Sequence, residues 1–588
     1  MKSKRNDFEN VYVFDFESRN SKKDIQENKT SIWLWDICSL NGFNHDTGLD
    51  MDSFIEKLKQ LAPATLYSHN LKFDGSFIIY YLYKHNFKYL EDTQNLEPNS
   101  FNCLISGDND IYYLRICFEQ KKGSRVKQFI ELRDSTKKIK GSVNQIAYSY
   151  HLPILKLEIN HELERQLNYQ PTKEEIEYIK HDTEIIARVL NIFYEKGMTS
   201  LTASADAFKM YKKDCGNSFR FLFPILPIEI DDYIRRALKG GLCYINPKHR
   251  GKTLNDVTIL DANSFYPYIA STMPLPYGKP EYFVGEPNPR EERPLYICHV
   301  KVCCKLKENH IPTLQLKQFY YYGKNEFVLD TMGEMIDFYL TNIDIDSMYE
   351  SYDVYDIEYI DGFYFLCSHK LFKRYISVLY KLKDESIGAQ RETNKILLNG
   401  LIGKFSTKTQ FINKKPLLFK GDKNLELEDT LYFEECLIEE KDPIYTALTV
   451  FVNSWGRAIL SYMINRNYNL FVYCDTDSLH LIGNVDWCDY KGINIDEHKL
   501  GYFKNEYKNN PIKNAKYLSE KTYFLILENG DSVVKCSGAP DYLKKLMTFE
   551  NFKYNAVFNE RLVPKYVKGG CVLVKSKFSI KDNENKEK

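Results

Sequence analysis

The sequence of 588 residues lacks the features of a membrane, secreted or zinc-binding protein. No apolar run approaches the ~20 residues that span a bilayer, and residues 1–10 are polar where a signal peptide needs an apolar core. The 14 cysteines include no C-x-x-C pair, so neither the usual zinc spacing nor a disulfide framework is visible. We therefore expect reduced thiols, no membrane insertion and no secretion.

An excess of charge of one sign is also absent. Lys and Arg together number 80, and so do Asp and Glu, which excludes a uniformly basic coat for nucleic acid. A nucleic-acid partner would need a local basic surface that acidic clusters balance elsewhere. Hydrophobic residues make up 43% of the chain, as in ordinary globular proteins, and the length suggests about three to five domains.

The predicted elements divide the chain into an α/β part and a longer α+β part. Residues 1–200 alternate strands and helices, a pattern typical of a sheet with flanking helices. Strands are expected over 11–16 and 64–68, and helices near 77–83 and over 174–193. Later segments are expected in this order: mixed helices and short strands from about 201, strands over 295–365, a helix over 375–405, a charged hairpin over 406–440, and a second strand-rich block over 470–537.

The first 200 residues contain four carboxylates and one phenol in a suggestive order. Asp15 and Glu17 end the first predicted strand, where residues i and i+2 face the same side. Asp74 begins an apolar helix, and Tyr178 and Asp182 share one helix face. Taken alone, each motif is more simply explained as a solvated strand end or helix surface. Together they fit a phosphodiesterase site with two Mg²⁺ ions ~3.5–4 Å apart, held by oxygen ligands.

A second group of carboxylates follows strands in the later half of the chain. Asp475 and Asp477 lie in a tight turn between two apolar strands, and Asp261 follows the apolar strand over 257–260. Acids in a turn usually serve the turn itself, but apolar flanks indicate a turn held rigidly inside a domain. A fold that brings Asp261 to Asp475 would create a second two-metal site, suited to phosphoryl transfer.

A polar stripe lies between these carboxylates on the predicted helix over 375–405. Its members recur every four residues: Arg391, Lys395, Asn399 and Gly403, with Lys383 two turns or so earlier. An exposed amphipathic face would explain the cations alone. Glycine inside a helix costs ~1 kcal/mol relative to alanine, so Gly400 and Gly403 favour close approach of a ligand.

In combination and order, these motifs resemble those of family B DNA polymerases, in particular the protein-primed branch of the phage phi29 type. The motifs are D-A-N-S-F-Y-P at 261–267, K-I-L-L-N-G-L-I-G at 395–403, Y-C-D-T-D-S at 473–478 and K-T-Y at 521–523, preceded by L-K-G-G at 238–241. The carboxylates of the first 200 residues resemble the DEDD 3′–5′ exonuclease of proofreading polymerases. The resemblance runs from Asp15 to about Phe578.

The resemblance implies a multidomain α/β and α+β fold, with an RNase H-like exonuclease domain and a right-hand polymerase domain that carries two terminal-protein-region insertions. The expected boundaries are 1–200 for the exonuclease, 201–272 and 441–537 for the palm, 273–371 for the first insertion, 372–405 for the fingers, 406–440 for the second insertion, and 538–588 for the thumb. The second insertion would be a β-hairpin that supports processivity and strand displacement.

The resemblance also implies a role for individual residues. Exonuclease metals would be held by Asp15, Glu17, Asp74 and Asp182, with Tyr178 and Lys156 assisting. The unpaired primer end would contact Asn70, Phe73 and Ser135. Polymerase metals would be held by Asp261 and Asp475, with Asp477 completing the acidic turn. The nucleotide would contact Tyr266, which excludes a 2′-hydroxyl, and Lys383, Arg391, Lys395 and Asn399. DNA would contact Gly240, Gly241, Lys521 and Tyr523.

Mg²⁺ is the expected metal at both sites, with Mn²⁺ as a substitute. The expected partners are primer–template DNA, deoxynucleotides and a terminal protein that acts as primer, and the expected location is the cytoplasm of an infected bacterial cell. Five positions depart from the family pattern without removing a metal ligand: Leu238, Gly400 and Ile402 in the polymerase motifs, and Thr136 and His161 in the exonuclease.

Two other functions are compatible with parts of the sequence. The chain could be a nuclease with a degenerate polymerase half, but Asp261, Lys395, Asp475 and Lys521 are all present. It could be a replication scaffold, but uncompensated clustered carboxylates repel one another, so a scaffold gains nothing by keeping them. Tyr266 argues against an RNA polymerase or a reverse transcriptase, because its ring would meet a ribose hydroxyl.

Overall fold

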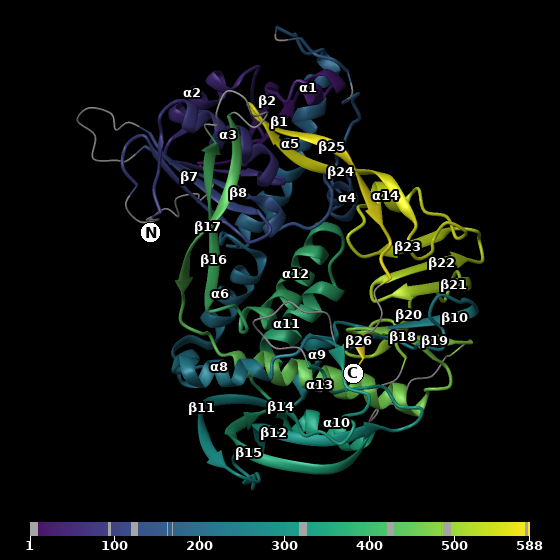
Figure 1. The fold of residues 1–588 in the computed structure, drawn as a ribbon. Coiled ribbons are helices and arrows are strands. Elements are labelled where there is room, and N and C mark those ends of the chain that lie inside the picture. The colour runs from purple at the N-terminus through teal and green to yellow at the C-terminus, as the bar shows by residue number, and fades with distance from the viewer. Residues whose placement is uncertain are drawn as a thin grey trace.

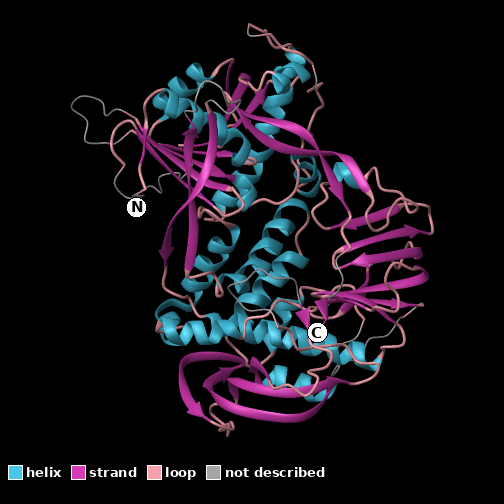
Figure 2. Ribbon diagram, viewed as in Figure 1, coloured by secondary structure: helices cyan, strands magenta, loops and turns pink. Residues whose placement is uncertain are grey.

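The computed structural model describes residues 10–91, 96–118, 128–161, 163–166, 168–316, 326–419, 429–483, 485, 495–582 and 586–587. Within these ranges, no helix is long and apolar enough to cross a membrane. Figure 1 shows an N-terminal sheet at the top, a central sheet at the right and a small sheet at the bottom, with helices α11 and α12 in the middle. The fold is therefore a multidomain combination of sheets and helices (Figure 2).

The N-terminal sheet has eight strands in the order β3-β2-β1-β4-β8-β7-β6-β5, and β1, β4 and β8 are parallel. Its strands are β1 (Val11–Ser18), β2 (Ile32–Ser39), β3 (His45–Gly48), β4 (Ala64–Ser68), β5 (Lys88–Tyr89), β6 (Ser100–Ile105), β7 (Ile111–Cys117) and β8 (Phe129–Asp134). Its helices are α1 (Lys22–Gln26), α2 (Met51–Leu61), α3 (Leu71–Lys84), the 3₁₀ turn η1 (Ser135–Lys137), α4 (Val143–Ser149) and α5 (Lys173–Glu195).

The sequence signals for this part are confirmed. Strand β1 is buried on both faces, because helices cover the two sides of the sheet, and its apolar residues therefore form a nearly continuous run. The expected strand over 64–68 is β4, and the expected helices lie within α3 and α5. Helix α5 begins after Thr172, whose side chain accepts a hydrogen bond from the backbone of Glu175 in a capping box.

The central sheet has the order β23-β22-β21-β10-β19-β18-β9, with β20 also paired to β10. Its strands are β9 (Cys243–Ile245), β10 (Thr253–Ala262), β18 (Phe471–Asp475), β19 (Ser478–Ile482), β20 (Phe503–Asn505), β21 (Ile512–Ser519), β22 (Thr522–Leu527) and β23 (Ser532–Cys536). Strands β18 and β19 form the expected strand–turn–strand, so the strand-rich block over 470–537 is confirmed.

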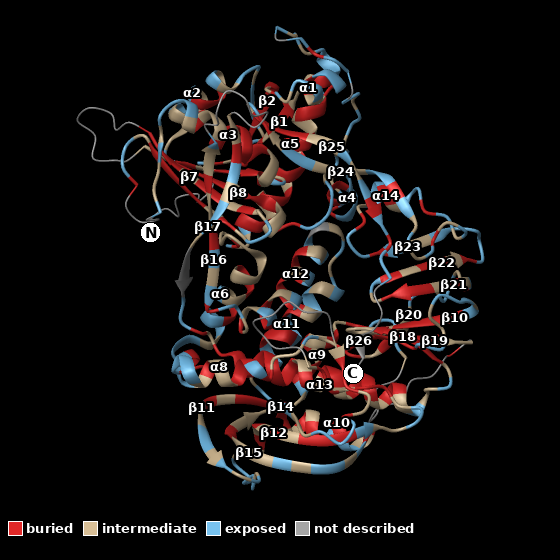
Figure 3. Ribbon diagram, viewed as in Figure 1, coloured by how far each residue is buried: buried red, intermediate tan, exposed pale blue. Residues whose placement is uncertain are grey.

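Helices pack between the sheets, with α13 as the most buried of the long ones (Figure 3). They are α6 (Ala203–Cys215), the 3₁₀ turn η2 (Gly216–Ser218), α7 (Phe219–Leu222), α8 (Ile228–Arg236), α9 (Phe265–Thr272), α11 (Lys373–Asp384), α12 (Gly388–Lys404), α13 (Thr446–Arg466) and α14 (Asp541–Lys544). The single helix expected over 375–405 is wrong. Gly388 adopts φ of 55°, a left-handed conformation that interrupts a helix, so α11 and α12 are separate.

Three further units complete the fold. The small sheet has the order β11-β15-β12-β14, formed by β11 (Leu275–Val284), β12 (Leu295–Leu306), β14 (Ile336–Thr341) and β15 (Tyr352–Ser368). Strands dominate 295–365 as expected, although α10 (Asn342–Ser351) interrupts them. A long hairpin joins β16 (Gln410–Phe419) to β17 (Thr430–Glu440), and a C-terminal hairpin joins β24 (Val557–Val567) to β25 (Gly570–Ser579). Short β13 (Glu326–Phe327) pairs with β26 (Lys586–Glu587).

The hairpin expected over 406–440 is thus confirmed by the pairing of 410–419 with 430–440. The long hairpin packs on the N-terminal sheet. Leu431 is buried in the apolar core of that sheet, and Asn413 accepts a hydrogen bond from the backbone N–H of Ile105 at 2.8 Å. The ring of Phe433 lies 5.2 Å from that of Tyr566 in the C-terminal hairpin. The two hairpins therefore touch each other beside the N-terminal sheet.

Candidate active sites

Strand order brings three carboxylates of the central sheet together. Strand β19 lies between β10 and β18, and Ser478 of β19 pairs with both Asp261 and Asp475. Asp477 lies in the turn between β18 and β19, and its carbonyl accepts a hydrogen bond from the backbone of Ala262 at 2.9 Å. The sequence places these acids more than 200 residues apart, and antiparallel pairing makes them neighbours.

Burial and mutual repulsion raise the pKa of two of these acids. Burial, followed by the charges of Asp477 and Glu506, raises the pKa of Asp261 to about 7. Burial, followed by the charge of Asp475, raises the pKa of Asp477 to about 6. The site therefore concentrates negative charge that a cation would relieve.

Two lysines lie near these carboxylates at distances too long for hydrogen bonds. Lys504 Nζ lies 3.8 Å from Asp261 Oδ1, and Lys521 Nζ lies 3.7 Å from Asp475 Oδ1. At these separations the groups form ion pairs rather than hydrogen bonds. The sequence analysis missed Lys504 and Glu506, since neither belongs to a motif and only the pairing of β20 with β10 brings them to the site.

A cavity of about 630 Å³ opens beside Asp261 and Asp477. Its lining includes the following expected nucleotide contacts: Tyr266, Lys383, Lys395 and Asn399. The expected stripe of α12 is exposed and borders this cavity. Arg391 is not among the described lining residues, and its guanidinium contacts the carbonyl of Lys383 at 3.5 Å.

Lys383 does not extend the stripe along one helix, because it lies on α11. Its Nζ donates a hydrogen bond to Ser264 Oγ at 3.1 Å. Burial, followed by the charges of Arg391 and Lys395, lowers its pKa. The two helices thus bring cations to the cavity from two sides, where an anionic ligand would relieve their repulsion.

Tyr266 is held tightly by glycines. A Cβ atom at Gly241 would lie 2.6 Å from the Tyr266 hydroxyl and 2.9 Å from Thr476 Cγ2, so only glycine fits there. A Cβ atom at Gly456 would lie 3.4 Å from the Tyr266 ring. Gly240 contributes its carbonyl, which accepts a hydrogen bond from Arg457 at 3.0 Å. The absence of a side chain at Gly241 therefore leaves room for the Tyr266 hydroxyl.

The second candidate site lies at β1, α3 and α5 of the N-terminal sheet. Burial, followed by the charges of Asp74, Asp182 and Glu17, raises the pKa of Asp15 well above its usual range. Burial also raises the pKa of Asp74 to about 7, against the hydrogen bond that Ser68 donates to it. These carboxylates are close enough to interact, as the sequence analysis expected.

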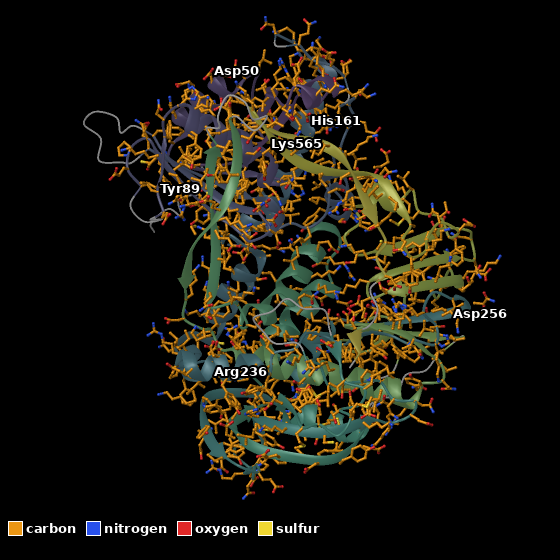
Figure 4. The ribbon with its side chains drawn as sticks, in the orientation of Figure 1. Asp50, Tyr89, His161, Arg236, Asp256 and Lys565 are labelled. Carbon is orange, nitrogen blue, oxygen red and sulfur yellow. The ribbon has the colours of Figure 1, made fainter. Side chains whose placement is uncertain are left out.

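Lys156 and Tyr178 complete this second site. Lys156 forms an ion pair with Asp182 and donates a hydrogen bond to the Tyr178 hydroxyl at 2.8 Å. Asp182 Oδ1 is buried and has no hydrogen-bond partner among the described residues. His161 Nδ1 lies 3.7 Å from Glu17 Oε2. This departure from the family pattern therefore also lies at the site. Figure 4 labels His161 on the N-terminal part of the molecule.

The residues expected to hold a primer end flank this site. Asn70 precedes α3 with φ of 93°, and its backbone N–H donates to Asp134 Oδ1 at 3.2 Å. Phe73 is half-buried against Phe77. Ser135 is fully buried, and its hydroxyl lies 2.9 Å from His69 Nδ1. Asn70 is exposed and Phe73 is half-buried, so a ligand can reach both, whereas Ser135 is buried behind His69.

Both sites suit a divalent metal by their donor chemistry. Their ligands are carboxylate oxygens, and the unpartnered Asp182 Oδ1 and the raised pKa values mark groups that a hard cation would stabilise. Among the described residues, no three His, Cys, Asp or Glu side chains already converge in ligand geometry. The exact ligand sets therefore remain proposals.

The departures in α12 have different consequences. Ile402 is nearly buried and lines the cavity, so its aliphatic side chain forms part of the surface that a nucleotide would contact. A Cβ atom at Gly400 would lie 3.5 Å from Ser204, an ordinary contact with α6. Gly400 therefore faces a neighbouring helix rather than the cavity, whereas Gly403 lines it.

Comparison with known proteins agrees with this geometry. Residues 59–486 match the family described as DNA polymerase type B, organellar and viral. The DNA polymerase of Bacillus phage B103 is 36% identical over 590 residues, and that of Streptococcus phage Cp-1 is 31% identical over 606 residues; each comparison covers 97% of this chain and 99% of the relative. The DNA polymerase of Bacillus phage phi29 is 35% identical over 592 residues with the same coverage.

A solved structure shows the same architecture. Phi29 DNA polymerase complexed with primer-template DNA and incoming nucleotide substrates gives a TM-score of 0.88 at 34% identity, covering 97% of this chain and 100% of that chain. The chain therefore belongs to the organellar and viral type B DNA polymerases and is a DNA-directed DNA polymerase of the phage phi29 type.

Proposed function

We propose that this polymerase extends a primer at the site of Asp261, Asp475 and Asp477 and removes nucleotides at the site of Asp15, Glu17, Asp74 and Asp182. The observation that carries the proposal is the cavity that joins Asp261 and Asp477 to Tyr266, Lys383 and Lys395. It combines carboxylates, an aromatic ring and cations, which are the groups that a deoxynucleoside triphosphate requires.

In the polymerase site, each group has a separate task. Asp261 and Asp475 would hold divalent metal, Mg²⁺ or Mn²⁺, which when bound supplies Lewis-acid activation and charge neutralisation. Lys383 and Lys395 would bind the triphosphate as positive charges, with Arg391 and Asn399 beside them. The Tyr266 ring, whose hydroxyl lies close to Gly241, would lie under the sugar and exclude a 2′-hydroxyl. Lys521 and Tyr523 would contact the primer end.

In the exonuclease site, Asp15, Glu17, Asp74 and Asp182 would hold metal of the same kind. Tyr178 would orient the attacking water, and Lys156, which bonds both Tyr178 and Asp182, would fix that orientation. Asn70 and Phe73 would hold the unpaired 3′ end, with Ser135 supporting them through His69. The result is 3′–5′ proofreading.

The domain layout follows from these roles. The N-terminal sheet would form an RNase H-like exonuclease domain, the central sheet the palm, α11 and α12 the fingers, and the C-terminal hairpin the thumb. The small sheet and the long hairpin would be the two terminal-protein-region insertions, within the boundaries expected from the sequence. The contact of Phe433 with Tyr566 supports a ring that closes around DNA.

The proposed substrates and partners are primer–template DNA, deoxynucleotides and a terminal protein that provides the priming hydroxyl. Solved relatives bind primer-template DNA and incoming nucleotides, and the relatives are phage enzymes. Replication of a linear viral or plasmid genome in the cytoplasm of an infected bacterium follows as the proposed setting.

The test of the polymerase site is substitution of its carboxylates. Asp261→Ala and Asp475→Ala should each lower nucleotide addition by at least ~10³-fold, because the developing charge loses its stabilisation. Primer extension with deoxynucleotides and Mg²⁺ measures the loss, and digestion of a single-stranded 3′ end in the same variants is the control. Extension near the wild-type rate in either variant would refute the assignment.

A further inference from the structure

The turn that carries Lys521 has an unusual backbone. Ser519 pairs with Thr522, so Glu520 and Lys521 form a two-residue turn between β21 and β22. Lys521 has φ of 56°, in the left-handed region. A side chain there brings Cβ close to the following carbonyl, and glycine or asparagine usually occupies such positions. An interaction outside the turn would offset the cost of this conformation at Lys521.

Tyr473 supplies that interaction. Its hydroxyl accepts a hydrogen bond from the backbone N–H of Lys521 at 2.9 Å, and Cys243 Sγ lies 3.3 Å from the same oxygen. Tyr473 is fully buried in β18. Its ring centroid lies 5.0 Å from that of His480, 5.6 Å from Tyr517 and 5.8 Å from Tyr523. Neighbouring rings thus hold the hydroxyl in place.

The same strand ties this contact to the proposed metal site. Tyr473 and Asp475 are i and i+2 on β18, so their side chains face the same side. From its left-handed position, Lys521 places Nζ 3.7 Å from Asp475 Oδ1. Fixing the backbone of Lys521 to Tyr473 therefore limits the positions that the ammonium group can take relative to the carboxylate.

We propose that Tyr473 is a positioning residue for primer use: its hydroxyl holds the turn so that the Lys521 ammonium stands at the Asp475 end of the site. Lys521 is more than half exposed, so its long side chain could otherwise sample many positions. A cation fixed there binds the phosphate next to the primer terminus. This inference rests on the proposed polymerase site, since it assumes that the primer end meets Asp475.

The test is Tyr473→Phe, which removes one oxygen and keeps the ring. The KM for primer–template should rise roughly three- to tenfold, as for loss of one buried hydrogen bond, while kcat at saturating DNA changes less than twofold. The matched control is Tyr352→Phe in the small sheet, a buried tyrosine whose hydroxyl also accepts backbone amides, from Thr313 and Leu314. Its primer KM should stay at the wild-type value.

A double-mutant cycle separates positioning from packing. In the Lys521→Ala background, Tyr473→Phe should have no further effect on the primer KM, because the group that it positions is gone. Amide hydrogen exchange at Lys521 should be faster in Tyr473→Phe than in wild type. Effects of the two substitutions that multiply, or a wild-type primer KM in Tyr473→Phe or in Lys521→Ala, would overturn the inference. None of these results depends on the Asp475→Ala test, whose failure would instead remove the proposed site.

Discussion

One aspartate in each candidate site, Asp74 and Asp261, holds its proton more tightly than a free aspartate does. The pKa of Asp74 and of Asp261 rises to about 7, chiefly because burial disfavours the charged form. Folding therefore binds protons at these positions between about pH 4 and pH 7, where the unfolded chain has released them. The ionised form costs stability in the metal-free fold, and that cost is the reason why a cation would bind there.

The sign of this linkage gives a prediction for thermal stability. Without divalent metal, stability should fall as the pH rises from about 4 to about 7 and level off above, since folded groups with raised pKa values lose their protons in that window. Mg²⁺ should raise the melting temperature by at least ~2 °C more at pH 8 than at pH 5.5. Differential scanning fluorimetry in EDTA and in Mg²⁺ measures both effects.

The control for this prediction is Asp74→Asn combined with Asp261→Asn. This variant removes two of the titrating groups and leaves Asp15 and Asp477, so its metal-free stability should depend less on pH and respond less to Mg²⁺. A wild-type response to Mg²⁺ in the double variant would show that the metal binds elsewhere.

Tyr266 gives a second prediction that depends on one side chain. Its hydroxyl lies where a Cβ atom at Gly241 would come within 2.6 Å of it, and the residue lines the cavity. Tyr266→Val should raise ribonucleotide incorporation relative to deoxynucleotide incorporation by at least ~10-fold, because steric exclusion of a hydroxyl is worth 1–3 kcal/mol. Competitive incorporation assays measure the ratio. An unchanged ratio would assign sugar selection to another residue, with Ile402 as the next candidate.

Among the elements, the long hairpin β16–β17 is the one proposed to hold DNA. It is anchored on the N-terminal sheet by Leu431 and Asn413, and its other side reaches the C-terminal hairpin, where Lys568 Nζ lies 3.9 Å from Asp429 Oδ2. Figure 1 shows the long hairpin at the left of the view, running past α6 toward the N-terminal sheet. A ring built from two hairpins and a sheet would hold DNA by topology as well as by affinity.

The prediction is that opening this ring shortens the products of synthesis. Residues 411–439 are replaced by a Gly/Ser linker; residues 406 and 407 stay, because buried Arg235 donates hydrogen bonds to their carbonyls. On a primed single-stranded circle and on a gapped duplex, with a trap for released enzyme, product length should fall at least ~5-fold, because an opened ring releases DNA more often while the second contact of a closed one raises the effective concentration.

A milder variant guards against misfolding. Tyr566→Ala with Lys568→Ala removes the contact between the hairpins and leaves the long hairpin in place. Both variants should add a single nucleotide at the wild-type rate. Equal product lengths for wild type and both variants on both templates would exclude the ring.

The two candidate sites lie on different sheets, and buried contacts connect the two parts of the molecule. Lys138, fully buried after β8, donates hydrogen bonds to the carbonyls of Met198 and Ser200 and to Asp206 Oδ2 on α6, at 2.6–2.7 Å. Helix α6 in turn packs on α12, which borders the polymerase cavity. A fixed spacing between the sites suits the transfer of a primer end from one to the other.

Separate ligand sets predict separable activities. Asp15→Ala with Glu17→Ala should lower digestion of single-stranded 3′ ends by at least ~10³-fold, because both substitutions remove metal-binding oxygens, and should leave extension of matched primers within twofold of wild type. Gel assays on one preparation measure the rates of digestion and of primer extension. Persistent digestion by the purified double variant would place the nuclease at other residues.

The sequence by itself determined the elements and motifs that depend on local patterns. Strands β1 and β4, the start of α5 after Thr172, the hairpin over 406–440 and the acidic turn at Asp475 all follow from runs of apolar residues, caps and turn residues. The motifs and their order also indicated the family, and the comparisons confirmed it. Local chemistry was sufficient here because each signal lies within a few neighbouring residues.

Only the tertiary structure decided how distant residues meet. Lys383 lies on a separate helix from the rest of the expected stripe. The left-handed φ of Gly388 interrupts a helix that the apolar pattern alone would continue. Lys504 and Glu506 reach the site through the pairing of β20 with β10, and Tyr473 holds Lys521 across two hairpins. Such contacts depend on strand order and burial, which involve residues hundreds of positions apart and leave no local pattern in the sequence.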